Sequence, residues 1–511
     1  MRPAGPAALA LAALLAALAP AAGCTRSAPP GRPAGREILT VAVRADVTGV
    51  FPNPPTSNEA FTIDLFSNVL EGLFRIDSAL AVKPALVTSW SNADGKTWTF
   101  RLREGVRFSD GTPLSAEDVT ASLRAAIETP FPTGAFLAAI RSVETVSPVE
   151  VRVTTREECP SLPSYLTAGF VLSRAALAGT PIPPLGTGPY AFAGREPGRS
   201  LTLLRNPYHE PRAAFDEIRL RVVPDGKARV AALLAGEADI AEAVPLDAVD
   251  ALSRDARFRV LARPGIRVLY LAPRVDRPPF DDARVREALD LAIDRDELNA
   301  RVYGGRGVPA SQPVPVTVVG YEESLPVTRA DRERARRLLD SAAGGSPVRV
   351  VLDAPSDRYL EDAALAREAA RQMELAGFRV TVRTRPKAEY FPFLETGAAQ
   401  LYLFSWACDT LEANDALDGA FRSPVSGRPP NQNHQGLADR ELDRLVDGAA
   451  RASEIAERIR LLRAAMSRLR EIRAAAFLVV MPETIAFSRR ISWTPPPTLV
   501  LRLHEVAPAP R

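Results

Sequence analysis

Residues Val69–Leu123 read VLEGLFRIDSALAVKPALVTSWSNADGKTWTFRLREGVRFSDGTPLSAEDVTASL. Within this stretch Trp98, Phe100 and Leu102 alternate with polar neighbours, which predicts a half-buried strand. Ser115 can cap a helix whose apolar residues recur every three to four positions. A strand that leads into a helix indicates a mixed α/β fold.

Strands and helices are predicted on both sides of this stretch by the spacing of apolar residues. The predicted strands are 38–43, 149–153, 201–204, 218–222, 348–352, 378–382 and 499–503. The predicted helices are 61–74, 115–127, 230–236, 285–293, 363–377 and 442–472, the last with an interruption at Gly448. The segment 348–382 is therefore a βαβ unit. The chain shows no repeat of about 20 to 50 residues, which argues against solenoids and propellers.

The length and composition exclude several classes of protein. At 511 residues the chain implies two to four structural units. It is 46% apolar and 24% charged, so it has enough apolar material for a core. The formal net charge of +3 is too balanced to indicate nucleic-acid binding.

The first 36 residues have the pattern of an export segment. An apolar run follows Arg2, and the small residues before Cys24 complete a leader at residues 1–23 that is too short to span a membrane in the mature protein. LAPAAGC resembles a bacterial lipobox, which implies a lipidated Cys24; cleavage after the Ala-rich segment without lipidation is the alternative. Residues 24–36 are predicted to be a flexible tether, and the protein is expected outside the cytoplasmic membrane.

Enzyme and metal motifs are missing from the sequence. It holds no G-x-S-x-G elbow, no H-E-x-x-H and no P-loop. His209, His434 and His504 lie far apart along the chain and form no close pair of metal ligands. We therefore expect no catalysis, no cofactor and no metal site.

The stretch 69–123 resembles the extracytoplasmic solute-binding proteins of ABC importers, family 5, the class of oligopeptide, dipeptide and nickel binders. Further blocks follow in that family's order, among them GTGPY at 186–190, LLAGEADIA at 233–241 and PPFDDARVREALDLAIDR at 278–295. Two positions depart from the pattern: Ser109 stands where His is common, and the usual Asn before PPFDD is missing. The motif residues are expected to hold the scaffold and not to touch ligand.

The resemblance implies an α/β fold of the two-lobed periplasmic-binding-protein type (type II, Venus flytrap), with an extra subdomain in the first lobe. The implied boundaries are 37–263 for lobe I, with the subdomain at about 58–180, 264–481 for lobe II, and 482–511 for the return to lobe I. The lobes would close on a solute as a hinge.

The resemblance also implies a ligand site at FSWACDT, residues 404–410. In peptide-binding relatives a Trp followed three positions later by Asp provides the carboxylate for the ligand's amino group, here Trp406 and Asp409. Tyr390, with Phe391 and Phe393, could line a pocket or lie on the buried face of a helix. The sequence singles out no Arg for a ligand carboxylate.

The function implied is a monomeric, lipid-anchored receptor that captures a small solute, with a peptide as the leading candidate, and delivers it to the permease of an ABC importer. Alternatives are a binder of nickel chelates, opines or oligosaccharides, a secreted hydrolase, or a sensory surface protein on the same fold.

Cys159 and Cys408 could form a disulfide or remain buried thiols.

Overall fold

Strands and helices alternate along the computed structural model, which describes residues 37–47, 62, 65–77, 81–128, 137, 139–177, 185–408, 410–425, 431–452, 454–496 and 499–510. The strands are β1 (Ile38–Val43), β2 (Glu71–Gly72), β3 (Phe74–Ile76), β4 (Val82–Pro84), β5 (Val87–Asn92), β6 (Thr97–Leu102), β7 (Ile140–Ser147), β8 (Glu150–Thr155), β9 (Phe170–Val171), β10 (Tyr190–Glu196), β11 (Ser200–Arg205), β12 (Glu217–Val222), β13 (Ile240–Glu242), β14 (Phe258–Pro273), β15 (Val308–Pro309), β16 (Arg349–Pro355), β17 (Arg379–Arg385), β18 (Leu401–Ala407), β19 (Ala476–Ser488), β20 (Ile491–Ser492) and β21 (Ala507–Pro508). The helices are α2 (Ala116–Ile127), α4 (Leu162–Tyr165), α5 (Arg174–Leu177), α6 (Gly226–Leu234), α7 (Leu246–Arg254), α8 (Ala283–Ala292), α9 (Arg295–Tyr303), α10 (Arg332–Ala343), α11 (Asp362–Leu375), α12 (Lys387–Glu395), α13 (Asn414–Ala416), α14 (Arg440–Arg451) and α15 (Ile455–Glu471), with a π-helical turn at Leu417–Phe421 and a 3₁₀ turn at Leu503–Glu505.

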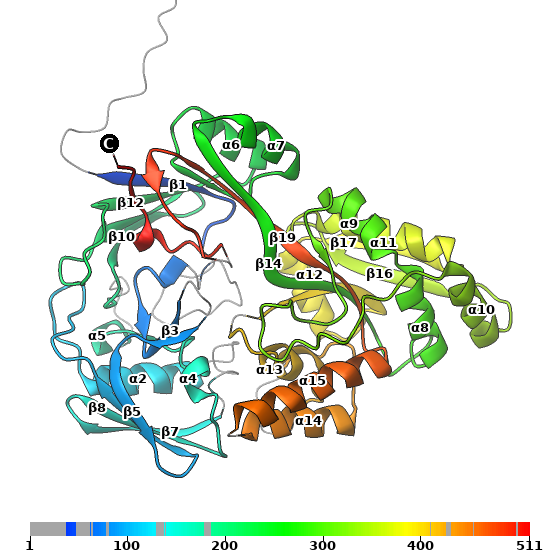
Figure 1. The fold of residues 1–511 in the computed structure, drawn as a ribbon, viewed down its shortest axis with the longest axis horizontal. Helices are drawn as coiled ribbons and strands as arrows, with labels where there is room; N and C mark the ends of the chain where they lie inside the picture. Colours follow the sequence, from blue (N-terminus) through cyan, green and yellow to red (C-terminus); the bar gives the residue numbers. More distant parts are fainter. Residues whose placement is uncertain are drawn as a thin grey trace, which may run out of the picture. The chain divides into compact units, whose positions relative to one another are not determined.

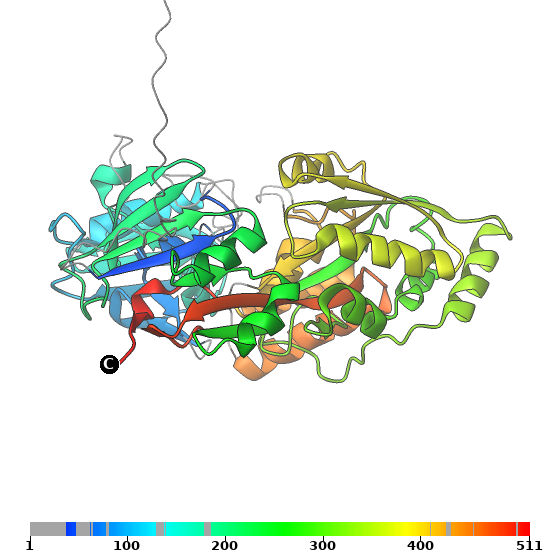
Figure 2. The same ribbon diagram turned by 90° about the horizontal axis from the view of Figure 1, so that it is seen from above.

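A mixed sheet of eleven strands forms the centre of the described chain, in the order β10-β11-β12-β1-β13-β19-β14-β18-β16-β17, with β15 also paired to β19. The long strands β14 and β19 are antiparallel and lie side by side (Figures 1 and 2). They pair with β13 on one side and with β18 on the other. We call the β10-to-β13 side with its helices the first lobe, and the β18-to-β17 side with its helices the second lobe.

The two long strands carry the chain from one lobe to the other. Pro264 on β14 lies opposite Pro482 on β19, and the register of the pair shifts between Pro264 and Val268. Separate buried clusters lie on the two sides, one around β1 and β12 and two around β16 and β18. The predicted crossings near 264 and 482 fall at this pair; the limits of the lobes stay a prediction.

A smaller sheet, β5-β6-β8-β7, packs with α2 around its own core in the first lobe. The Ser115 hydroxyl donates to Asp118 at 2.6 Å and the Ser115 amide donates to the same carboxylate at 3.0 Å, which fixes the start of α2. A Cβ at Gly186 or Gly188 would overlap the backbone of Val69. These motif residues thus hold the scaffold together.

The predicted βαβ unit is confirmed as β16, α11 and β17, with β16 and β17 parallel. The predicted helix 442–472 is two helices, α14 and α15, and the break follows Arg451. Gly448 lies inside α14, so the predicted interruption is wrong in position. A single Gly weakens a helix by only about 1 kcal/mol, which packing outweighs here.

Two further predicted elements differ from the structure. The helix predicted for 61–74 does not extend through its last residues, because Glu71–Gly72 and Phe74–Ile76 are strands. The strand predicted for 499–503 is absent from the described chain: Leu499 has φ +52° and Leu503 begins a 3₁₀ turn. Leu501 and Leu503 are nevertheless buried, so the alternation reports burial without strand pairing.

Cys159 and Cys408 are both buried thiols. They belong to different core clusters, and the Cys408 thiol donates to the Glu412 carbonyl at 3.0 Å. A search of the described residues for a helix of membrane-spanning length and hydropathy found none.

Candidate ligand-binding site

The carboxyl ends of three parallel strands meet at one edge of the second lobe. β16 is parallel to both β17 and β18, so the chain leaves the sheet on the same side after Pro355, Arg385 and Ala407. Loops at such an edge are where open α/β sheets bind ligands. The predicted site at 404–410 therefore lies at the sheet edge that is best suited to a ligand.

The equivalent edge of the first lobe faces this one. β13 ends at Glu242, opposite Ile485, and Ile485 lies opposite Leu261 on β14. β18 ends at Ala407, opposite Arg267 on the same strand. Six residues of β14 separate the two ends, at most about 20 Å of strand. The strand ends of the two lobes thus point toward each other.

Trp406 is held at this edge by a buried acid. Its indole Nε1 donates to Asp415 Oδ1 at 3.0 Å, and Asp415 is only 4% exposed. Asp415 also accepts from the amide and the hydroxyl of Thr410, at 3.1 and 3.0 Å. Gly419 leaves room for the indole ring of Trp406, because a Cβ at residue 419 would overlap that ring. Trp406 itself is half-buried.

The other predicted contacts have different outcomes. Asp409 lies outside the described residues, between the buried Cys408 and Thr410. Tyr390 is fully buried and its hydroxyl donates to the Leu403 carbonyl at 2.7 Å. A ligand contact by Tyr390 would require this packing to open, and it stays a prediction. Phe393 packs against Arg385, whose Cζ is 3.9 Å from the ring centroid.

Arg267 is the cation that the sequence did not single out. It is half-buried on β14, and its Nη1 donates to the Ser405 hydroxyl at 2.9 Å. Its Cζ lies 6.0 Å from the centroid of Tyr359, on the loop after β16. Within the described part of the chain no ion pair joins Arg267 to a carboxylate. Only the pairing of β14 with β18 brings it to this edge, so no local motif could have marked it.

The first-lobe edge carries a cation that is already paired. Arg44 follows β1, and its amide donates to Glu242 Oε2 at 3.2 Å while its guanidinium lies 3.4 Å from Oε1. The neighbouring Arg229 is 4% exposed and donates to four backbone carbonyls. Arg44 and Arg229 therefore already have partners within the protein, whereas Arg267 has no carboxylate partner among the described residues.

The comparison with protein families decides the class of the molecule. The sequence profile of the bacterial extracellular solute-binding proteins, family 5 (middle region), matches residues 81–427. The chain belongs to this family. Family 5 proteins bind solutes and are not enzymes, and the two-lobed fold described above is the fold of this class.

Relatives of this family 5 protein cover nearly its whole length. The glutathione-binding protein GsiB of Escherichia coli (strain K12) is 27% identical over 479 residues, which are 90% of this chain and 92% of GsiB. The dipeptide-binding protein of Pseudoalteromonas sp. SM9913, solved with Met-Leu, has a TM-score of 0.82 at 23% identity and covers 92% of this chain and 100% of its own. AgaA of A. tumefacien R10, solved with agropinic acid, has a TM-score of 0.81 at 21% identity, over 93% and 99% of the two chains. These structures share the fold of the present chain.

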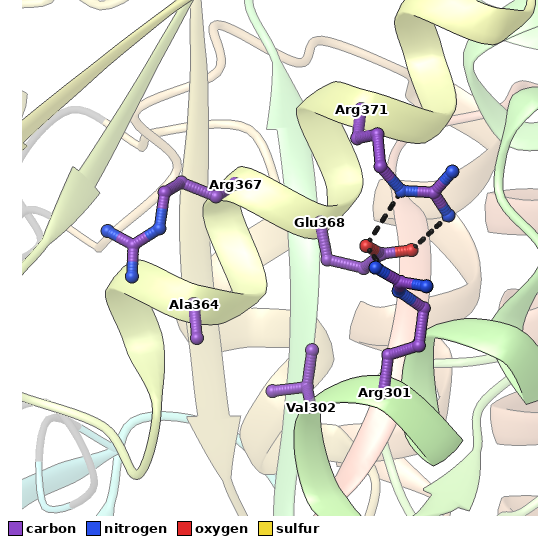
Figure 3. Close-up of a pocket in the computed structure, with 6 residues that line it drawn as sticks. All are labelled: Arg301, Val302, Ala364, Arg367, Glu368 and Arg371. Atoms are coloured by element: carbon purple, nitrogen blue, oxygen red, sulfur yellow. Dashed lines mark hydrogen bonds and ion pairs between the residues drawn. The ribbon is translucent and has the colours of Figure 1, made fainter.

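The family 5 chain also has a pocket away from the sheet edges, between α9 and α11 (Figure 3). Its volume is about 370 Å³, and its lining is Arg301, Val302, Ala364, Arg367, Glu368 and Arg371. Glu368 pairs with Arg301 at 3.0 Å and with Arg371 at 2.6 Å, so much of its charge is already compensated. All six of these lining residues lie on α9 and α11 and none lies at the end of a strand, so we do not assign the solute to this pocket.

Two of the three histidines have pKa values well below the usual one. Burial lowers the pKa of both His434 and His504 to about 4, with nearby Arg residues as the second cause. His434 packs against the rings of Tyr402 and Phe404. The described residues contain no group of three or more His, Cys, Asp or Glu side chains arranged to hold a metal ion.

Proposed function

We propose that this family 5 protein captures a small peptide with a free amino group and a free carboxylate, between the facing strand ends of the two lobes. The observation that carries the proposal is Arg267, a half-buried guanidinium with a serine hydroxyl beside it and no carboxylate partner among the described residues. A guanidinium at such a site suits a ligand carboxylate, which it can bind with two parallel hydrogen bonds.

The amino end of the ligand is assigned to Asp409, with Trp406 beside it. A buried ammonium group needs an anion and further hydrogen bonds to offset its loss of water. The bond from Trp406 to Asp415 supports this assignment, because it fixes the ring next to the segment that carries Asp409. The names of GsiB and the dipeptide-binding relative point to the same ligand class.

The remaining parts of the proposal concern the cell. We infer that the protein works as a monomer, anchored to a membrane outside the cytoplasm by a lipidated Cys24. It would hand its solute to the permease subunits of an ABC importer. The sequence of the leader and the family membership support this placement.

The ligand class is tested by titration calorimetry with Met-Leu, N-acetyl-Met-Leu and Met-Leu amide. Each blocked peptide should bind about 10- to 150-fold more weakly than Met-Leu, the range for one hydrogen bond to a charged group. In Arg267→Gln, Met-Leu and Met-Leu amide should bind with equal affinity, whereas N-acetyl-Met-Leu should still bind more weakly than Met-Leu. Asp409→Asn should do the reverse.

Arg257→Gln is the matched control, because Arg257 is an exposed guanidinium that pairs with Asp255. It should leave all three affinities unchanged. Equal binding of Met-Leu and both blocked peptides would overturn the proposal. The proposal would also be overturned if only a nickel–histidine complex, an opine or an oligosaccharide bound when titrated in the same way, or if the peptide were cleaved.

A further inference from the structure

Polar contacts join the two lobes at a place that neither long strand reaches. The Ser161 hydroxyl, at the start of α4 in the first lobe, lies 3.3 and 3.4 Å from the two carboxylate oxygens of Glu412 in the second lobe. Ser161 is 3% exposed and Glu412 is 8% exposed. The Ser161 side chain makes no capping bond to its own helix. Its bond to Glu412 is therefore directed across the lobes.

Two further contacts flank this one. Asn414 Nδ2 donates to the Tyr165 hydroxyl at 3.3 Å, and Asn414 is 4% exposed. Glu157 and Arg451 form an ion pair whose side chains are about half exposed. In all three cases a residue of the segment 157–165 meets a residue of the segment 412–451. The contacts have a buried centre and a solvated rim.

The second lobe holds Glu412 in position by itself. Arg458 Nη1 lies 3.5 Å from Glu412 Oε2, and Arg458 also donates to the Ala452 carbonyl from Nε and Nη2. Separating the lobes would leave this pair intact within the second lobe, whereas Ser161 would lose its bond. The contact with Ser161 therefore exists only when the lobes are together.

We propose that Glu412 is a closure latch: it stabilises the closed arrangement of the lobes through Ser161, without touching the solute. A hydrogen bond to a charged group shifts an equilibrium by roughly ten-fold or more. Such a contact raises the share of closed molecules before any solute binds, and it slows the release of solute afterwards.

Small-angle X-ray scattering on the chain from Glu37 to Arg511, which forms one compact unit, tests the latch. Any carried solute is first removed by dialysis from guanidinium chloride, and none is added. Ser161→Ala should lower the ratio of closed to open molecules about ten-fold. Its radius of gyration should accordingly exceed that of the wild type.

Ser122→Ala is the matched control, because the buried Ser122 hydroxyl donates to the Leu172 carbonyl at 3.1 Å within the first lobe. Its scattering should equal that of the wild type. Far-UV circular dichroism checks that each variant folds, and Tyr165→Phe gives a second test of the same surface should Ser161→Ala not fold. Identical scattering of the wild type and the folded latch variants would overturn the proposal. The result does not depend on which solute the protein binds.

Discussion

At the scale of single residues, the site depends on a side chain that the sequence did not mark. Trp406 was predicted at the site, but Asp415, which accepts its indole hydrogen bond, was not. Local spacing indicates residue types and their element; it does not show which acid nine positions later turns back to the ring. Arg267 was missed for a related reason, since β14 brings it beside Ser405 from 138 positions away.

Trp406→Phe should lower the free energy of unfolding by about 1 to 3 kcal/mol, because the buried Asp415 carboxylate loses a donor. Urea unfolding followed by circular dichroism measures the change. Trp90→Phe is the control, since Trp90 is 43% exposed, and it should cost less than about 0.5 kcal/mol. Equal losses in the two variants would show that the Asp415 bond contributes nothing.

At the scale of helices and strands, regular spacing was a good guide where one face is buried. The βαβ unit β16-α11-β17 and the capped helix α2 follow from such patterns. The pattern failed where burial and secondary structure separate: in the tail, Leu501 and Leu503 are buried although no strand forms there. The break after Arg451 was also misplaced, because a glycine is a weaker helix breaker than tertiary packing.

The 3₁₀ turn at Leu503–Glu505 should make folding stability depend on pH through His504. Burial lowers the pKa of His504 from 6.5 to about 4, so below pH 6.5 the unfolded chain binds a proton that the folded chain excludes. Stability from this group is present above pH 6.5, falls as the pH drops toward 4, and then levels off. His504→Gln should remove about 1 to 2 kcal/mol of that loss, less than the full shift implies, because the side chain is 32% exposed.

Chemical denaturation at pH 7.5, 5.5 and 4.5 measures this effect. As the pH falls, the free energy of unfolding of the wild type should decrease relative to that of His504→Gln. A difference that is the same at all three pH values would show that His504 titrates normally in the folded protein.

At the scale of the whole molecule, the two-lobed fold followed from family-like motifs, whereas the contact between the lobes did not. Ser161 and Glu412 are 251 positions apart, and nothing in either segment indicates its partner.

A physical consequence of the contact between Ser161 and Glu412 is a pH effect on closure. Burial raises the pKa of Glu412 above 4.5 despite the nearby Arg458 and Ser161. Cys159 and Tyr165, from the first lobe, also interact with this carboxylate.

Separating the lobes would expose Glu412 to water, so its pKa should return toward 4.5 in the open form. A proton on Glu412 then favours closure, and the closed form loses stability as the pH rises above 4.5. The radius of gyration without solute should therefore be smaller at pH 5 than at pH 7.5. Glu412→Gln, which carries no charge at either pH, should show no such difference. An equal pH response in both proteins would assign the effect to other groups.

The central claim is that the chain holds a small solute and releases it unaltered. Native mass spectrometry of the chain Glu37–Arg511, purified without refolding and then supplied with Met-Leu, tests this most directly. We predict one intact dipeptide per protein, recovered at unchanged mass after denaturation, and a much smaller bound fraction for Arg267→Gln and Asp409→Asn. Separate Met and Leu in the extract, or an unliganded wild type across Met-Leu and glutathione, would contradict the account.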